Sequence, residues 1–181
     1  PSMRVPKFRA AKALKEAGNK VIGVIGARTR RQLVLEAQMR IACQKIFIAT
    51  NDGSYERKGM ASEVVKELFD KEPIKYIYTA GPAEMMRSIV GMAETKGIPA
   101  GVFVNPVMLC GNGVCGSCRV KVGHETVLAC QDGPYFPGSE VDFDDLKVRM
   151  SAYKGVTESP DGEIEEPASV SRLLSEIFRQ T

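Results

Sequence analysis

The sequence predicts an α/β protein with two main parts, a parallel sheet covered by helices and a smaller β-rich module that carries cysteines. Before residue 105 four short apolar runs alternate with amphipathic segments, and after it glycine, cysteine and short alternating runs prevail. Alternation of strands with helices is typical of a parallel sheet, because each helix carries the chain back to the same edge. We expect the first part in residues 1–104 and the second in residues 105–153.

The four apolar runs are the predicted strands. Each is short, nearly continuous and rich in β-branched residues, which is typical of strands buried on both faces. They cover residues 20–27, 45–50, 74–81 and 99–105.

Apolar residues at helical spacing mark the predicted helices between these strands. The first helix is expected to end at Gly18, and the apolar stripe of the second includes Leu33, Leu35 and Met39. The four predicted helices lie within residues 6–19, 29–42, 60–72 and 83–97.

Composition restricts the classes of function. A formal charge of +3, evenly spread, argues against a nucleic-acid partner. No apolar run is long enough to cross a bilayer, and the first residues lack the layout of a secretion signal. Five cysteines cannot all pair with one another, so we expect a cytoplasmic, reducing location, where clustered thiols more often bind metal.

Four of the cysteines form the most specific pattern in the chain. Cys110, Cys115 and Cys118 lie on one loop, and Cys130 returns from the end of a predicted strand. The x4-then-x2 spacing on the loop is typical of a plant-type [2Fe–2S] cluster. Structural zinc sites usually take their ligands as two separated short pairs.

Glycines within this loop also favour a cluster. A backbone that wraps around inorganic sulfide needs left-handed torsions and close approach of its N–H groups, and glycine permits both. The loop contains Gly111, Gly113 and Gly116. A four-cysteine zinc knuckle and a chance cluster of thiols remain open, since ligand number does not choose the metal.

Two further residues are expected to lie outside the site. Cys43 stands next to a predicted helix end and is interpreted as a small core residue. His124 stands in a predicted hairpin turn and is expected to face solvent. It is the only histidine of the chain, whereas a Rieske site needs two.

A group of arginines follows the first predicted strand. In dinucleotide-binding folds this position contacts the adenosine ribose, and guanidinium groups there suit the 2′-phosphate of NADP better than the free hydroxyl of NAD. A solvated helix start would explain the same arginines. The stretch reads Gly26, Ala27, Arg28, Thr29, Arg30 and Arg31.

The usual beginning of a dinucleotide fold has no counterpart in the sequence. Such folds open with a strand and a glycine-rich phosphate loop, whereas residues 1–8 lead almost directly into the first predicted helix. That strand is central, so its loss removes hydrogen-bond partners from its neighbours. We expect a truncated or split product, whose missing part is supplied by another polypeptide or replaced by rearrangement. Micromolar binding of NADP(H) by the chain alone would contradict this.

Residues 154–181 form a third part, an acidic linker followed by an amphipathic helix. The linker in residues 155–169 bears proline and almost no apolar residue. The helix either packs on its own chain or docks on a partner subunit. Its apolar face carries Leu173, Leu174, Ile177 and Phe178.

Five stretches together resemble one family of flavoproteins. In order along the chain they resemble the C-terminal half of the electron-transfer subunits of dihydroorotate dehydrogenase. Related proteins are the small subunit of NADH-dependent reduced ferredoxin:NADP oxidoreductase, sulfide dehydrogenase and the gamma subunit of cytochrome-c3-type hydrogenases; the segment beside the cysteines is closer to the first two. The resemblance spans roughly residues 8–153. It rests on residues 26–40, 50–65, 78–86, 105–122 and 129–145.

The resemblance implies a fold and a set of contacts. It implies a ferredoxin-reductase-like NAD(P) domain, N-terminally truncated, and then a [2Fe–2S] domain whose ligands are the four cysteines. It places Arg28 at the adenosine end of the nucleotide, with Asp52 and Gly53 lining the same groove. Gly81 and Pro82 would lie near the nicotinamide. The family's FAD-binding barrel has no counterpart here, so FAD is expected only in the complete assembly.

We therefore expect an electron-transfer subunit of an NAD(P)-linked iron–sulfur flavoprotein oxidoreductase, inactive on its own. Its partners would be a catalytic subunit and a separate FAD-domain polypeptide, and electrons would pass through the cluster one at a time. The alternative is a non-enzymatic assembly or regulatory module with a degenerate nucleotide fold and a zinc site. A thioredoxin-like catalyst that uses Cys115 and Cys118 is disfavoured, because its cysteine pair should open a helix near its first strand.

Overall fold

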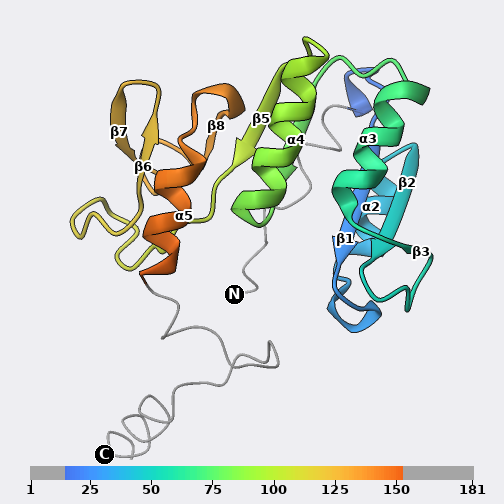
Figure 1. The fold of residues 1–181 in the computed structure, drawn as a ribbon, viewed down its shortest axis with the longest axis horizontal. Helices are drawn as coiled ribbons and strands as arrows, with labels where there is room; N and C mark the ends of the chain where they lie inside the picture. Colours follow the sequence, from blue (N-terminus) through green and yellow to red (C-terminus); the bar gives the residue numbers. More distant parts are fainter. Residues whose placement is uncertain (1–14, 153–181) are drawn as a thin grey trace, which may run out of the picture. The chain divides into compact units, whose positions relative to one another are not determined.

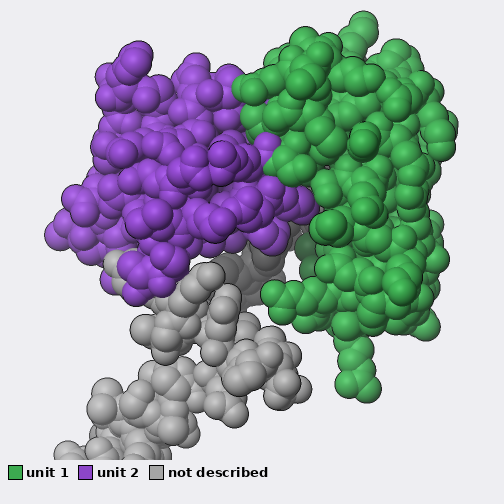
Figure 2. All heavy atoms as spheres, in the orientation of Figure 1, with its two compact units in different colours: residues 1–77, 88–99 green, residues 78–87, 100–181 purple. Residues whose placement is uncertain are grey.

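The structure, a computed structural model, describes residues 15–152 of the chain. The chain divides into two compact units (Figure 2). The first comprises residues 1–77 and 88–99, and the second comprises residues 78–87 and 100–181. The predicted linker and C-terminal helix lie outside the described residues, as does most of the first predicted helix.

A parallel sheet forms the centre of the first unit (Figure 1). β1 (Ile22–Ala27) pairs along its whole length with β2 (Lys45–Thr50), and β2 pairs with the short β3 (Arg57–Lys58). Both long strands are apolar, and Ile48 and Ala49 of β2 are completely or almost completely buried. The first two predicted strands and their parallel pairing are confirmed.

α3 (Ala61–Lys71) covers this sheet. Its Val64 and Leu68 are four positions apart on one helix face and form a core with Ala49 of β2. The helix can approach β1 closely because Gly26 has no side chain. A Cβ at Gly26 would lie 2.7 Å from the Cβ of Ala61.

The second predicted helix is shorter than expected. A 3-10 turn occupies Arg30–Gln32, and α2 (Glu36–Ala42) begins only after Leu35, whose φ of 65° is left-handed. The backbone N–H of Arg30 donates to Ser54 Oγ at 2.8 Å, so a bond from a distant loop holds this turn. The prediction of one helix over residues 29–42 was therefore wrong in its first half.

The second unit contains a short sheet and a hairpin. β4 (Ile77–Ala80), β5 (Ala100–Phe103) and β8 (Tyr135–Pro137) form the sheet in that order, with β5 and β8 antiparallel. The hairpin consists of β6 (Arg119–Val122) and β7 (Glu125–Leu128).

Two further helices follow in the chain. α4 (Ala83–Thr95) links β4 to β5, and its residues from Ser88 onward belong to the first unit. α5 (Phe143–Ser151) lies in the second unit and follows a 3-10 turn at Gly138–Glu140. α5 begins at Asp142, whose carboxylate accepts the N–H of Asp145 as an N-terminal cap. Leu146 of this helix is fully buried.

The expected single sheet is divided into two three-stranded sheets. Among the described residues, β1 pairs only with β2 and β4 pairs only with β5, so each has one open edge. No helix within residues 15–152 is both long and apolar enough to cross a membrane.

Cys43 and His124 were expected to be a core residue and a solvent-facing turn residue. Cys43 ends α2 and is buried at 6% exposure, with its Sγ over Gly23 of β1. His124 lies exposed in the turn between β6 and β7. Both expectations are confirmed.

Candidate iron–sulfur site

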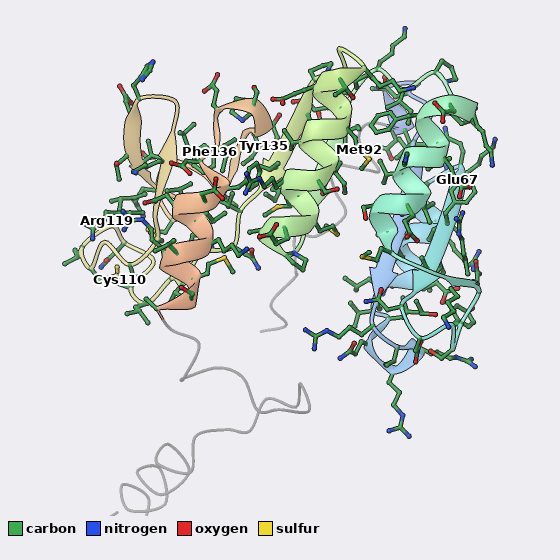
Figure 3. All side chains as sticks on the ribbon, in the orientation of Figure 1. Glu67, Met92, Cys110, Arg119, Tyr135 and Phe136 are labelled. Carbon is green, nitrogen blue, oxygen red and sulfur yellow. The ribbon has the colours of Figure 1, made fainter. Side chains whose placement is uncertain are left out.

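The loop between β5 and β6, together with the end of β7, carries the four candidate ligands. Cys110 and Cys115 lie on the exposed part of the loop, where Figure 3 shows Cys110. Cys118 directly precedes β6 and is buried at 1% exposure. Cys130 follows β7, and the hairpin brings it to Cys118, because the N–H of Ala129 donates to the carbonyl of Cys118 at 3.0 Å.

The four cysteines form two pairs. The backbone N–H of Cys115 donates to Cys110 Sγ at 3.4 Å, and the two side chains also interact. Cys118 and Cys130 lie close enough for the Cys130 backbone and side chain to affect the pKa of the Cys118 thiol. Within residues 15–152 no three His, Cys, Asp or Glu side chains converge tightly enough to hold one metal ion.

Glycines give the loop its path around the first pair. Gly111, Gly113 and Gly116 have φ values of 68°, 84° and 65°, a region that residues with a Cβ rarely adopt. Gly113 also lies against the side chain of Gln131, since a Cβ there would lie 3.1 Å from Gln131 Cγ. The predicted need for left-handed glycines in this loop is therefore met.

Two polar side chains contact the candidate ligands. Ser117 Oγ lies 3.1 Å from Cys115 Sγ and accepts the N–H of Leu109 at 3.2 Å. Gln131 Nε2 donates to the carbonyl of Gly111 at 2.9 Å, and lies 3.8 Å from Cys130 Sγ.

Hydrogen bonding and burial act on the thiols in opposite directions. The hydroxyl and backbone N–H of Ser117, followed by Cys110, lower the pKa of Cys115 to about 6. Burial raises the pKa of Cys118. Cys115 is therefore ready to bind a cation near neutral pH, whereas Cys118 needs a bound cation to offset the cost of a buried negative charge.

This donor set fits a two-iron cluster. An all-cysteine [2Fe–2S] centre has two thiolates on each iron, and the loop and hairpin supply two neighbouring pairs. The left-handed glycines of the loop suit the close approach of sulfide.

The candidate nucleotide contacts of the first unit lie on two adjoining loops. Gly26 and Ala27 end β1, and the exposed arginines follow on the next turn. The loop after β2 is tied to it, since the N–H of Asp52 donates to the carbonyl of Arg28 at 3.2 Å. The guanidinium of Arg30 lies 4.9 Å from the ring centroid of Tyr55.

The second loop is closed by a hydrogen-bonded turn. Both the N–H and the hydroxyl of Ser54 donate to Asp52 Oδ1, at 3.0 and 2.7 Å, and these bonds lower the pKa of Asp52. Gly53 follows in the left-handed region with φ of 76°. Asp52 is thus held ionised beside the arginine turn.

Gly81 and Pro82 belong to the second unit, apart in the chain from these loops. Gly81 has φ of 153°, and the carbonyl of Pro82 accepts the N–H of Met86 at the start of α4. The two residues form a strand-to-helix turn at the end of β4.

Comparisons with known proteins find similarity to electron-transfer subunits. Residues 105–142 match the family model described as the iron–sulfur cluster binding domain of dihydroorotate dehydrogenase B. The chain is 39% identical over 147 residues to a Thermotoga maritima protein named as a homolog of the electron-transfer subunit of dihydroorotate dehydrogenase B; this covers 81% of the chain and 52% of the relative. A Methanocaldococcus jannaschii relative with a similar name is 33% identical, over 76% and 52% of the two chains.

A solved structure gives the same result. The structure described for NADH-dependent reduced ferredoxin-NADP oxidoreductase matches with a TM-score of 0.73 and 36% identity, covering 82% of the chain and 53% of that chain. The chain is thus related to the electron-transfer subunits of dihydroorotate dehydrogenase B and to this oxidoreductase, and the predicted resemblance is confirmed. The chain spans about half the length of the curated relatives that it matches.

Ser117 and Gln131 were not identified from the sequence. Each is adjacent in the chain to a candidate ligand, and that adjacency is the available signal. Their contacts join positions 8 and 20 residues apart, which the cysteine spacing does not specify.

Proposed function

We propose that the chain holds a [2Fe–2S] cluster on Cys110, Cys115, Cys118 and Cys130 and serves as an electron-transfer subunit of an NAD(P)-linked flavoprotein oxidoreductase. The bound cluster supplies one-electron transfer, so the protein needs no acid, base or nucleophile of its own. Its residues hold the cluster, provide hydrogen bonds to its ligands and leave one face accessible.

The grouping of the cysteines into two pairs carries this proposal. A single zinc ion needs four donors around one centre, whereas a two-iron cluster needs two donors at each of two centres. The Cys110–Cys115 contact and the Cys118–Cys130 contact suit the second arrangement. The family match over residues 105–142 supports it independently.

The outer face of the cysteine loop supports a role in electron transfer to a partner. Met108, Leu109 and Val114 are 41%, 70% and 84% exposed on the same loop as Cys110 and Cys115. Electron-transfer contacts are small and need close approach, and apolar side chains around the ligands favour such contact. A catalytic subunit is the proposed partner, as the relatives' names suggest.

We propose NADP as the nucleotide and the arginine turn as its adenosine site. Arg28, Arg30 and Arg31 are exposed on one turn and provide guanidinium groups for a 2′-phosphate. Gly26, Ala27, Thr29, Asp52 and Gly53 would line this site, and Gly81 and Pro82 would contact the nicotinamide. FAD would belong to the complete assembly.

We propose a separate role for each of the three parts of the chain. Residues 1–104 would bind the nucleotide, residues 105–153 the cluster, and residues 154–181 would provide a linker and a docking helix. A cytoplasmic location suits a chain whose unpaired thiols bind a cluster.

Metal analysis of anaerobically purified chain tests the proposal. Two irons and two sulfides per chain, with a rhombic paramagnetic resonance signal after reduction, would support it. One zinc and no visible absorbance would favour the alternative, an assembly or regulatory module. Colourless, magnetically silent protein after reconstitution with iron and sulfide would refute the redox function.

A further inference from the structure

Ser117 makes a close contact with one candidate ligand. Its Oγ lies 3.1 Å from Cys115 Sγ, and the same oxygen accepts the backbone N–H of Leu109 at 3.2 Å. The side chain is partly buried between two ligand positions, Cys115 and Cys118. The hydroxyl is therefore held by the loop and directed at the cluster side of it.

The direction of the hydrogen bond follows from the donors present. A cysteine that binds iron is a thiolate and carries no proton, so only the hydroxyl can donate between Ser117 and Cys115. The N–H of Leu109 already occupies a lone pair of Ser117 Oγ. The hydroxyl proton is thus free to point at the sulfur.

We propose that Ser117 is a positioning residue that raises the reduction potential of the cluster. The inference rests on the proposed function, because it requires Cys115 to be a cluster ligand. An added electron increases the negative charge on the ligand sulfur. A hydrogen-bond donor to that sulfur stabilises the reduced state more than the oxidised state.

Gln131 offers a contrast within the same site. Its Nε2 lies 2.9 Å and 3.2 Å from the carbonyl oxygens of Gly111 and Cys130, but 3.8 Å from Cys130 Sγ. Its stronger bonds go to the backbone, so it holds the loop beside the end of β7. Removing Gln131 should loosen the cluster site, whereas removing the Ser117 hydroxyl should change its potential.

The test uses the full chain reconstituted with iron and sulfide. The midpoint potential is measured by reductive titration followed by paramagnetic resonance, for the native chain and for S117A, S117T, Q131L and S151A. Ser117→Thr keeps a hydroxyl, and Ser151→Ala removes a hydroxyl that donates to the Val148 carbonyl at the end of α5. Iron and sulfide content is measured for each variant.

We expect S117A to keep its iron, sulfide and rhombic signal but to titrate at a lower potential. S117T should restore the native potential, S151A should not change it, and Q131L should lose its cluster faster to a chelator. An S117A protein with the native potential would overturn the proposal. So would loss of the cluster from S117A, since the hydroxyl would then be structural. Absence of the cluster from the native chain would instead refute the proposed function.

Discussion

The cysteine loop and the arginine turn are organised in different ways. All four candidate cluster ligands, with the hydrogen bonds that orient them, lie within residues 105–132 of one unit. The candidate nucleotide contacts are divided between the two units, and β1, which leads into the arginine turn, pairs on one side only within the described residues. The comparison shows that a site closed by local hydrogen bonds is specified by its own segment, whereas a site at strand ends depends on the whole sheet.

Replacement of a buried cysteine gives the largest expected effect. Cys118→Ala removes one of the four proposed ligands and should abolish the proposed cluster, visible as loss of absorbance and of the reduced-state resonance. Cys43→Ala is the matched control, because Cys43 is also buried but packs on β1. It should keep the full cluster content and lose only stability. Equal cluster content in the two variants would remove Cys118 from the ligand set.

The close approach of α3 to β1 should be the next most sensitive feature. Gly26→Val would place a Cβ 2.7 Å from the Cβ of Ala61 and overpack the first unit, which we expect to cost about 1–3 kcal/mol in denaturant unfolding. The cluster domain should still reconstitute, since its ligands lie in the other unit.

Two controls accompany this substitution. Ala61→Gly in the same chain should recover part of the loss, because the two positions are in direct contact. Gly91→Ala in α4 adds a Cβ with no atom within 4 Å and should be neutral or stabilising. If Gly26→Val were as well tolerated as Gly91→Ala, the packing of α3 on β1 would be wrong.

The same contrast explains which features the sequence predicts well. The cysteine loop, the hairpin turn at His124 and the strand at residues 45–50 depend mainly on residues close in sequence. The structure contains all three. The helix expected from residue 29 does not begin until residue 36. The left-handed backbone of Leu35 interrupts the helix, and the Arg30 N–H is bonded to Ser54, 24 residues away; periodicity contains no information about either feature.

The pairing of the cysteines is only partly predictable from the sequence. The spacing indicates four ligands, but the pairing of Cys118 with Cys130 depends on the register of the β6–β7 hairpin. Ser117 acquires its contacts when the cysteine loop closes on itself, and Gln131 acquires its contact when the loop meets the end of the hairpin. Such contacts become visible in three dimensions and not in a pattern of residue types.

The arginine turn should discriminate between adenosine phosphates. We expect 2′,5′-ADP to bind about tenfold more tightly than 5′-ADP, since one charge-assisted contact to the 2′-phosphate contributes roughly 1.4 kcal/mol. Arg28→Glu should abolish this preference in a calorimetric titration. Arg119→Glu makes the same charge reversal at the start of β6, outside the turn, and should preserve it. A preference that survives Arg28→Glu would assign the arginines to the solvated surface.

The smallest expected effect is on stability at low pH, through the ion pairs of Glu72 in the first unit. Glu72 forms ion pairs with Lys20 at 2.6 Å and Lys45 at 2.5 Å, and their hydrogen bonds lower its pKa to about 2. A carboxylate with a lowered folded-state pKa stabilises the fold fully above its unfolded pKa of about 4.5, and this contribution is lost as the pH falls toward 2.

Glu72→Gln should therefore lower the thermal midpoint slightly at pH 7, and the difference between the two proteins should shrink as the pH falls toward 2 and the Glu72 carboxylate becomes protonated. Glu94→Gln is the comparison variant, because Glu94 is exposed on α4 and forms no ion pair within residues 15–152. Lys20 precedes β1 in the chain and Lys45 begins β2, so the two ion pairs of Glu72 connect the beginnings of the two paired strands. If Glu72→Gln had the same effect at both pH values, the open-edged sheet would be held by packing alone.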